Sequence, residues 1–190
     1  MSQRHPIISI TGSSGAGTST VRDTFAQIFF REKVKAAFIE GDAFHRFDRA
    51  EMKKRMTEAQ GNPANHFSHF GEEANEFALL EDVFKTYGET GNGRTRTYVH
   101  DEEEAEQWGC PPGTFTDWRS FEDDTDLLFY EGLHGAVATD RVDIARYADL
   151  KVGVVPVMNL EWIQKLHRDK SKRGYSTEAV TDTILRRMHD

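Results

Sequence analysis

Short apolar runs alternate with amphipathic segments along this chain of 190 residues. Four runs have the length and composition of strands buried in a sheet, and they cover residues 7–10, 35–40, 127–132 and 150–155. Apolar side chains recur at helical spacing in residues 19–31 and 77–88, and the second helix should end at Gly88. Because strands and helices alternate, the pattern predicts an α/β fold with a mostly parallel sheet flanked by helices.

The segments between these elements are more polar. Residues 51–60 have a polar helical pattern, and Gly93–His100 alternates in the manner of a strand. The acidic run Asp101–Gln107 is interpreted as a solvated excursion over the surface. The helical pattern of residues 177–189 has no cap, glycine or proline to end it, so we expect one domain, residues 1–190, truncated at its carboxyl end.

A glycine-rich turn separates the first predicted strand from the first predicted helix. Such a turn and the positive end of the following helix form a concavity of N–H groups that suits a phosphate. Gly12 and Gly17 fit the phosphate-loop pattern G-x-x-x-x-G-K-[ST], and Ser19 supplies the hydroxyl that would meet a magnesium ion, but Thr18 replaces the lysine. A simple glycine-rich turn is the alternative. The predicted nucleotide-binding residues are Gly12, Ser13, Ser14, Gly15, Ala16, Gly17, Thr18, Ser19 and Thr20.

Charged residues follow two of the predicted strands. Asp42 and His45 come after the second strand, and Glu131 closes the apolar run of residues 127–132. Ligands of open α/β sheets collect at the carboxyl ends of strands, so these side chains should lie beside the glycine loop. A carboxylate such as Glu131 at the end of a core strand typically faces the metal of the nucleotide. The alternatives are a solvated turn with Asp42 as a helix cap, and a Glu131 side chain that faces water.

Two further sets of polar residues are candidates for a phosphate site and a metal site. Glu161 with Lys165 and Lys165 with Asp169 have i,i+4 spacing, so spacing alone favours a solvated, self-paired helix face. In the functional interpretation, Lys165 supplies the positive charge that the phosphate loop lacks. His66 and His69 share a helical spacing, but a metal site is a weak interpretation because no third ligand has a matching spacing.

Composition narrows the class of protein. Lys and Arg number 24 against 32 Asp and Glu, and the net charge of −8 disfavours nonspecific binding to nucleic acid or an acidic membrane. Cys110 is the single cysteine, which excludes a disulfide framework within these residues and fits a reducing compartment. No apolar run has the length of a signal peptide or a membrane span. We therefore expect a cytoplasmic protein.

Four motifs closely resemble those of the bacterial-type branch of the phosphoribulokinase/uridine kinase family, namely residues 12–20, 40–46, 129–134 and 154–162. The resemblance covers the whole chain, and it includes the threonine at position 18, which that branch shares. It implies a P-loop kinase fold like that of the nucleoside monophosphate kinases. Family members are longer, so the chain resembles their N-terminal portion.

The resemblance also implies a reaction and its participants. The reaction is ATP-dependent phosphorylation of D-ribulose 5-phosphate to ribulose 1,5-bisphosphate in the Calvin cycle, with Mg²⁺ and, in the full-length protein, a homo-oligomer. Asp42 takes the role of catalytic base and Lys165 that of the cation at the transferred phosphate. Glu131 and Asp169 lie near the metal. The implied substrate contacts are His45, Arg49, Arg168 and Arg173.

Two other functions stay open at this point. A uridine-kinase-like nucleoside kinase would keep the loop lysine, and its acceptor carries no phosphate, so the clustered arginines argue against it. A nucleotide-binding regulatory module that has lost catalysis would explain Thr18 as a trace of that loss. A GTPase switch is disfavoured because no Asn-Lys-x-Asp guanine motif occurs.

Overall fold

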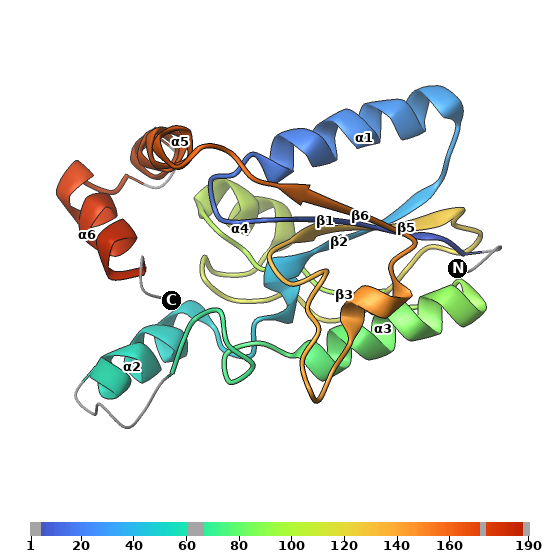
Figure 1. The fold of residues 1–190 in the computed structure, drawn as a ribbon, viewed down its shortest axis with the longest axis horizontal. Coiled ribbons are helices and arrows are strands. Elements are labelled where there is room, and N and C mark those ends of the chain that lie inside the picture. Colours follow the sequence, from blue (N-terminus) through green and yellow to red (C-terminus); the bar gives the residue numbers. More distant parts are fainter. Residues whose placement is uncertain (1–4, 61–66, 172–173, 188–190) are drawn as a thin grey trace.

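The computed structural model describes residues 5–60, 67–171 and 174–187, and its centre is a parallel sheet with the strand order β2-β5-β1-β6 (Figure 1). The sheet comprises β1 (Ile7–Gly12), β2 (Ala36–Glu40), β5 (Leu127–Gly132) and β6 (Leu150–Val154). A separate antiparallel pair is formed by β3 (Arg94–Thr95) and β4 (Arg119–Ser120). All four predicted strands of the parallel sheet are therefore confirmed.

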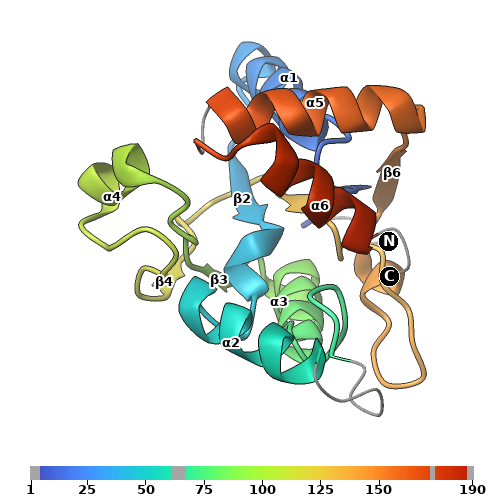
Figure 2. The same cartoon turned by 90° about the vertical axis from the view of Figure 1, so that its left-hand side faces the viewer.

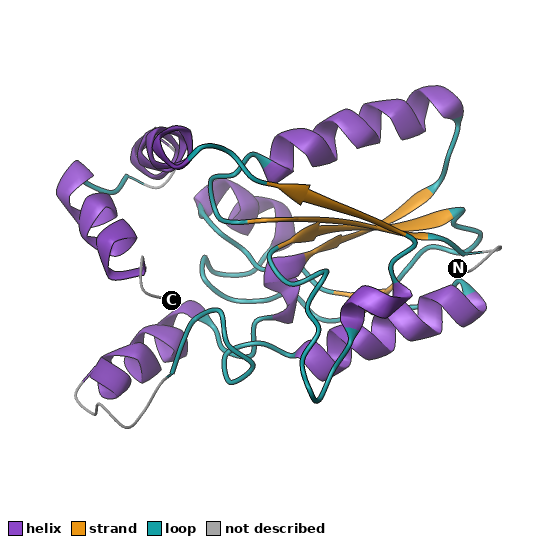
Figure 3. Ribbon diagram, viewed as in Figure 1, coloured by secondary structure: helices purple, strands orange, loops and turns teal. Residues whose placement is uncertain are grey.

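Helices cover both faces of the sheet, with α1 on one face and α3 on the other (Figure 3). The helices are α1 (Thr18–Glu32), α2 (Arg49–Gln60), α3 (Phe77–Thr90), α4 (Glu102–Trp108), α5 (Met158–Ser171) and α6 (Thr177–Arg187), with short 3₁₀ helices η1 (Gly41–Phe44) and η2 (Ile144–Tyr147). Figure 2 faces the carboxyl end of the sheet and shows α5 and α6 packed against each other. The described part of α6 confirms the last predicted helix as far as residue 187.

The side chains of β5 alternate between the two faces of the sheet. Leu128 and Tyr130 are fully buried in the cluster that includes α3, whereas Phe129 is fully buried in the cluster that includes α1. Successive side chains of a strand point to opposite faces, so an apolar run is what a strand covered on both sides requires. This packing holds the carboxyl end of β5 rigidly beside those of β1 and β2.

Two predicted boundaries were wrong. The helix predicted to end at Gly88 continues as α3 to Thr90, and it ends at Gly91, whose φ of 75° is the left-handed conformation of a helix cap. The predicted strand Gly93–His100 is reduced to Arg94–Thr95 and an isolated bridge between Tyr98 and Phe115. The alternating pattern of residues 93–100 is not sufficient to form a longer strand, because the partner strand β4 is only two residues long.

The acidic run predicted as a surface excursion forms α4. Asp101 caps this helix by accepting a hydrogen bond from the backbone N–H of Glu104, and the first turn carries Glu102, Glu103 and Glu104. None of the residues of α4 is buried, so the run lies at the surface as predicted, and its carboxylates also stabilise the positive end of the helix.

The strand predicted as buried over 150–155 is the edge of the described sheet. β6 pairs with β1 alone in the described sheet order, and Leu150 is 46% exposed. At the carboxyl end of β5 the backbones approach closely: a Cβ on Gly132 would lie 2.8 Å from Gly41 Cα, so glycine is needed where β5 passes the turn after β2. No helix in the described part of the chain has the length and apolar character of a membrane span.

Candidate functional site

The glycine loop between β1 and α1 has the backbone of a phosphate cradle. Gly15 and Gly17 have φ values of 102° and 98°, which L-residues with side chains rarely adopt. The N–H of Ala16 donates to the carbonyl of Ser13 at 2.9 Å, and α1 begins directly after Gly17. The loop therefore turns back on itself in front of a helix N-terminus, where an anion is stabilised.

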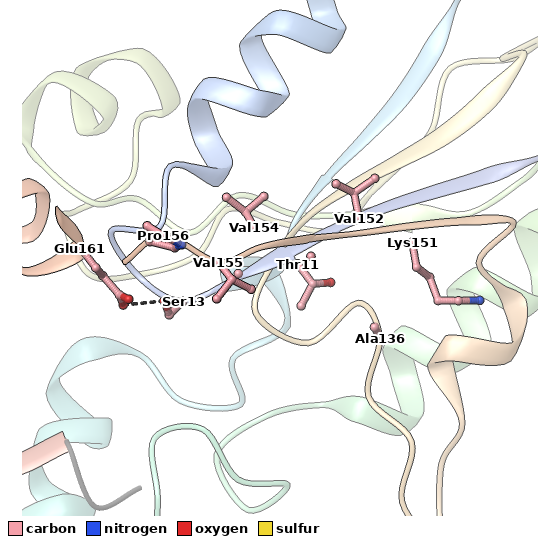
Figure 4. A pocket seen from close by; sticks show the side chains of 11 residues that line it. Thr11, Ser13, Ala136, Lys151, Val152, Val154, Val155, Pro156 and Glu161 are labelled. Atoms are coloured by element: carbon pink, nitrogen blue, oxygen red, sulfur yellow. Dashed lines mark hydrogen bonds between the residues drawn. The ribbon is translucent and has the colours of Figure 1, made fainter. Parts of the chain in front are cut away.

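Helix α5 lies against this loop. Ser13 Oγ donates to Glu161 Oε1 at 2.5 Å (Figure 4), and the guanidinium of Arg168 donates to Ser14 Oγ at 3.0 Å. A Cβ on Gly15 would lie 3.2 Å from Lys165 Cβ, so the backbones approach closely here as well. The helix that follows the edge strand thus delivers its charged face to the loop.

The ion pair between Lys165 and Asp169 forms as its spacing predicts, but it is not solvated. Lys165 Nζ lies 3.0 Å from Asp169 Oδ2, and their side chains are only 12% and 6% exposed. Arg168 Nε lies 3.0 Å from the other oxygen of Asp169. Burial raises the pKa of Asp169, but hydrogen bonds from Lys165 and then Arg168 outweigh burial and lower it. The interpretation as a solvated helix face was therefore wrong for this group.

Thr18, which replaces the loop lysine, hydrogen-bonds to Glu131 at the end of β5. Burial raises the pKa of Glu131, and the hydrogen bond from Thr18 and the charge of Arg22 oppose this rise only in part. Arg22 of α1 also pairs with Glu40 at 2.6 Å, and Glu40 is the register partner of Glu131 in the sheet. Thr18 and Arg22 both belong to α1, so the first turns of this helix hold the carboxylate of Glu131 at the loop.

Asp42 lies in η1, directly after β2, between two histidines. Nε2 of His45 is 3.2 Å from Asp42 Oδ1, and Nε2 of His100 is 3.0 Å from Oδ2. Nδ1 of His100 in turn lies 3.1 Å from Glu104 of α4. The Asp42 side chain is still 50% exposed, so a ligand can reach it from solvent.

The negative charge of Asp42 and the positive charges of His45 and His100 stabilise one another. Burial raises the pKa of Asp42, but hydrogen bonds from His100 and His45 outweigh burial and hold the pKa well below its usual range. Burial lowers the pKa of both histidines, and the hydrogen bond and charge of Asp42 more than reverse this, so both pKa values are raised. Asp42 is therefore an ionised acceptor at neutral pH.

Asn75 fixes a hydrogen on Nδ1 of His45. The Asn75 Nδ2 group donates to the carbonyls of His69 and Gly71 at 3.0 and 2.8 Å, so its Oδ1 is the acceptor that faces His45 Nδ1 at 2.8 Å. His45 Nδ1 therefore donates. An ionised Asp42 can only accept, so Nε2 of His45 donates as well, which describes an imidazolium ring.

Arg49, a predicted substrate contact, joins the same cluster through the backbone. Its guanidinium donates to the carbonyl of His100 at 2.7 Å and lies 5.8 Å from the centre of the Tyr98 ring. The described contacts thus form two groups, one around the glycine loop and α5 and one around Asp42. Glu131 lies between them, because β5, which carries it, lies between β2 and β1 in the sheet.

Several contributors to the Asp42 group were missed in the sequence. His100 and Glu104 lay in a predicted strand and a predicted surface run, and Asn75 was not singled out. His100 is 58 residues from Asp42, and no local pattern connects positions so far apart. Two residues named in the sequence analysis, Arg173 and His66, lie outside the described residues. The ring of His69 lies 4.9 Å from that of His45.

A model of the "Phosphoribulokinase / Uridine kinase family" matches residues 7–190. The chain belongs to this family. Among its relatives, a phosphoribulokinase of Nitrobacter vulgaris is 69% identical over 190 residues, and phosphoribulokinase 1 of Cereibacter sphaeroides is 67% identical over 189. Each match covers 100% of this chain but only 66% and 65% of the relative, so the chain spans slightly less than two thirds of their length.

Solved structures of phosphoribulokinase/uridine kinase family members confirm the P-loop kinase fold. A phosphoribulokinase from Rhodobacter spheroides matches with a TM-score of 0.81 and 63% identity, and the match covers 98% of this chain and 63% of that one. A possible uridine kinase from Bacillus stearothermophilus matches with a TM-score of 0.55 at 14% identity, covering 91% of this chain and 85% of that one. The second likeness concerns the fold alone.

The oxygen donors at the loop fit the Mg²⁺ that a kinase of this family would use with ATP. Among the described residues, no three His, Cys, Asp or Glu side chains gather as a metal site made by protein alone. Mg²⁺ bound with a nucleotide typically takes one or two carboxylates together with phosphate oxygens. Glu131 is held beside the loop, and the exposed Ser19 is the second residue of α1, whereas Asp169 already pairs with Lys165 and Arg168.

The raised pKa values of the two histidines can be tested directly. His45 and His100 should titrate above their ordinary value of about 6.5 in the unliganded protein. In Asp42→Asn both midpoints should fall, because burial persists without the opposing charge of Asp42. NMR titration of the imidazole signals measures both, and unchanged midpoints would contradict the assigned ion pairs.

Proposed function

We propose that the full-length protein is a phosphoribulokinase, which transfers a phosphoryl group from ATP to D-ribulose 5-phosphate and forms ribulose 1,5-bisphosphate for the Calvin cycle. The observation that carries this proposal is the identity of 69% and 67%, over this whole chain, to relatives named phosphoribulokinase. The geometry supports it, because a phosphate cradle, a buried cation and an ionised carboxylate lie at one end of the sheet. These are the parts that phosphoryl transfer requires.

In the proposed mechanism, the glycine loop from Gly12 to Thr20 binds the phosphates of ATP through backbone N–H groups. The Thr18 hydroxyl is neutral, so the positive charge comes from α5, where Lys165 is held by Asp169 next to Gly15. Bound Mg²⁺ would neutralise phosphate charge, with Ser19 and Glu131 as its proposed protein ligands. Asp169 is proposed as a further ligand through the lone pairs that remain beside its pairs with Lys165 and Arg168.

Asp42 would accept the proton of the attacking hydroxyl. A carboxylate has about four lone-pair sites, so Asp42 can bind an acceptor hydroxyl while it still accepts hydrogen bonds from His45 and His100. These two hydrogen bonds fix its orientation, and its half-exposed side chain leaves room for the sugar. The general base is thus oriented before the substrate arrives.

The phosphate of ribulose 5-phosphate would be bound by cations that surround this position. His45 is an imidazolium, and Arg49 lies in the same cluster. Arg168 reaches the glycine loop from α5, and Arg173, which follows it in the sequence, completes the proposed set of substrate contacts. Guanidinium groups bind a phosphate through two parallel hydrogen bonds, which suits an acceptor that carries one.

The proposal also covers the compartment, the assembly and the class of substrate of the enzyme. The 190 residues would form a single P-loop kinase unit of a longer chain that acts in the cytoplasm as a homo-oligomer, on a small sugar phosphate rather than on nucleic acid. The net charge of −8 supports the last point, because it opposes binding to a polyanion.

An acceptor panel tests the function. The full-length protein with Mg²⁺ and ATP is offered ribulose 5-phosphate, uridine or no acceptor, and ADP formation is measured. We expect turnover with ribulose 5-phosphate alone. Turnover with uridine instead would indicate a nucleoside kinase, and ATP binding without turnover on any acceptor would indicate a regulatory module.

A further inference from the structure

Arg96 contacts the turn that carries Asp42 without contacting Asp42 itself. Its Nε donates to the carbonyl of Ala43 and its second terminal nitrogen donates to the carbonyl of His45, both at 2.8 Å. The end of a short helix such as η1 leaves backbone carbonyls without partners in the helix. One planar guanidinium therefore holds two carbonyls on either side of Phe44.

Aromatic rings hold the guanidinium in this position. Arg96 Cζ lies 3.7 Å from the centre of the Phe115 ring and 4.7 Å from that of Trp118. The ring of Phe44, a buried residue of the turn, packs edge-on against Trp118 at 5.6 Å. Among the described residues no carboxylate lies at ion-pair distance from Arg96, so rings and carbonyl dipoles surround this cation.

We infer that Arg96 is a positioning residue, whose guanidinium fixes the η1 turn so that Asp42 and His45 keep the orientation needed to receive the acceptor. The catalytic consequence of this inference rests on the proposed function. The geometry explains why arginine is required. Two hydrogen bonds in a fixed fork define the direction of the turn, whereas the ammonium of a lysine is a point charge that could reach a carbonyl without defining that direction.

Strand β3, which ends one residue before Arg96, offers a matched control. Arg94 is exposed, and its guanidinium lies 5.2 Å from the centre of the Trp118 ring, but in the described contacts it does not reach the turn. Arg94→Ala therefore removes a cation over the same ring and leaves both carbonyl hydrogen bonds in place. A difference between Arg94→Ala and Arg96→Ala reports on the turn rather than on charge or ring contact in general.

The experiment compares Arg96→Ala, Arg96→Lys and Arg94→Ala in the full-length protein. Misplacement of a catalytic group by about 1 Å can cost ~10²-fold, so kcat with ribulose 5-phosphate should fall ~10- to 100-fold in Arg96→Ala, with the KM for ATP changed by less than about threefold. Arg94→Ala should stay within about twofold of wild type. Added guanidinium ion at millimolar concentration should restore part of the lost kcat in Arg96→Ala, because it can enter the vacated space between the rings and the carbonyls.

A second measurement does not depend on turnover. The imidazole NMR signals of His45 in the unliganded protein should shift in Arg96→Ala and stay in place in Arg94→Ala. If wild type fails to use ribulose 5-phosphate, the proposed function fails, and the His45 signals still decide the role of Arg96. Should Arg96→Ala not fold, Arg96→Lys carries both measurements. The inference is overturned if the Arg96 variants keep kcat within about twofold of wild type, or if the His45 signals are unchanged.

Discussion

Replacing Asp42 by asparagine in the full-length protein should lower kcat by ~10²-fold or more while ATP still binds. Asparagine keeps the size of the side chain but cannot take up the proton of the attacking hydroxyl at neutral pH. The phosphate cradle does not depend on Asp42, because its contacts come from the glycine loop and α5. Steady-state turnover with ribulose 5-phosphate and equilibrium binding of ATP measure the two effects separately.

The control for this substitution is Asp82→Asn, which changes an exposed carboxylate on α3. It should leave turnover within about twofold of wild type, as is usual for surface positions. Near-normal turnover in Asp42→Asn would remove Asp42 from the role of general base. Loss of ATP binding in that variant would show instead that the substitution disturbs the nucleotide site.

Lys165→Met should reduce kcat by ~10² to 10³-fold with a much smaller change in the KM for ATP. The Lys165 side chain is only 12% exposed and its Cβ lies beside Gly15 of the glycine loop, where Thr18 offers no charge. A cation that acts mainly on the charge of the transferring phosphoryl group stabilises the transition state more than bound ATP. Steady-state kinetics with varied ATP distinguishes the two effects.

Lys85→Met on α3 is the matched control, because Lys85 is exposed and lies on a helix away from the loop. A second variant, Thr18→Lys, restores the lysine of the general phosphate-loop pattern. If Lys165→Met turned over normally, the charged face of α5 would serve structure alone, whereas recovery of turnover in Lys165→Met by Thr18→Lys would support Lys165 as the substitute for the loop lysine. A rise in the KM for ATP without loss of kcat would assign Lys165 to ground-state binding.

The sequence was sufficient for features that depend on neighbouring residues. The loop from Gly12 to Gly17 was predicted because a glycine-rich turn between a strand and a helix fits the phosphate-loop pattern, and the structure has φ values of 102° and 98° at Gly15 and Gly17. The run 127–132 was predicted to be buried because a strand covered on both faces needs apolar side chains at every position. The placement of Asp42 and Glu131 at one sheet edge followed from the parallel order of the strands.

Only the tertiary structure decided which side chains complete the site. His100 reaches Asp42 across 58 positions, and Arg96 reaches the η1 turn across 53. The charged face of α5 gave two interpretations in the sequence, and only the packing shows that its Lys165–Asp169 pair is shielded from solvent and that the helix contacts Ser13 and Ser14 of the loop. The physical reason is that periodicity and turn chemistry act over a few residues, whereas burial and pairing depend on which surfaces the chain brings together. The sequence thus determined the phosphate loop and the strand ends around it, and the packing of α5 and of the segment 94–104 decided how their charges are paired.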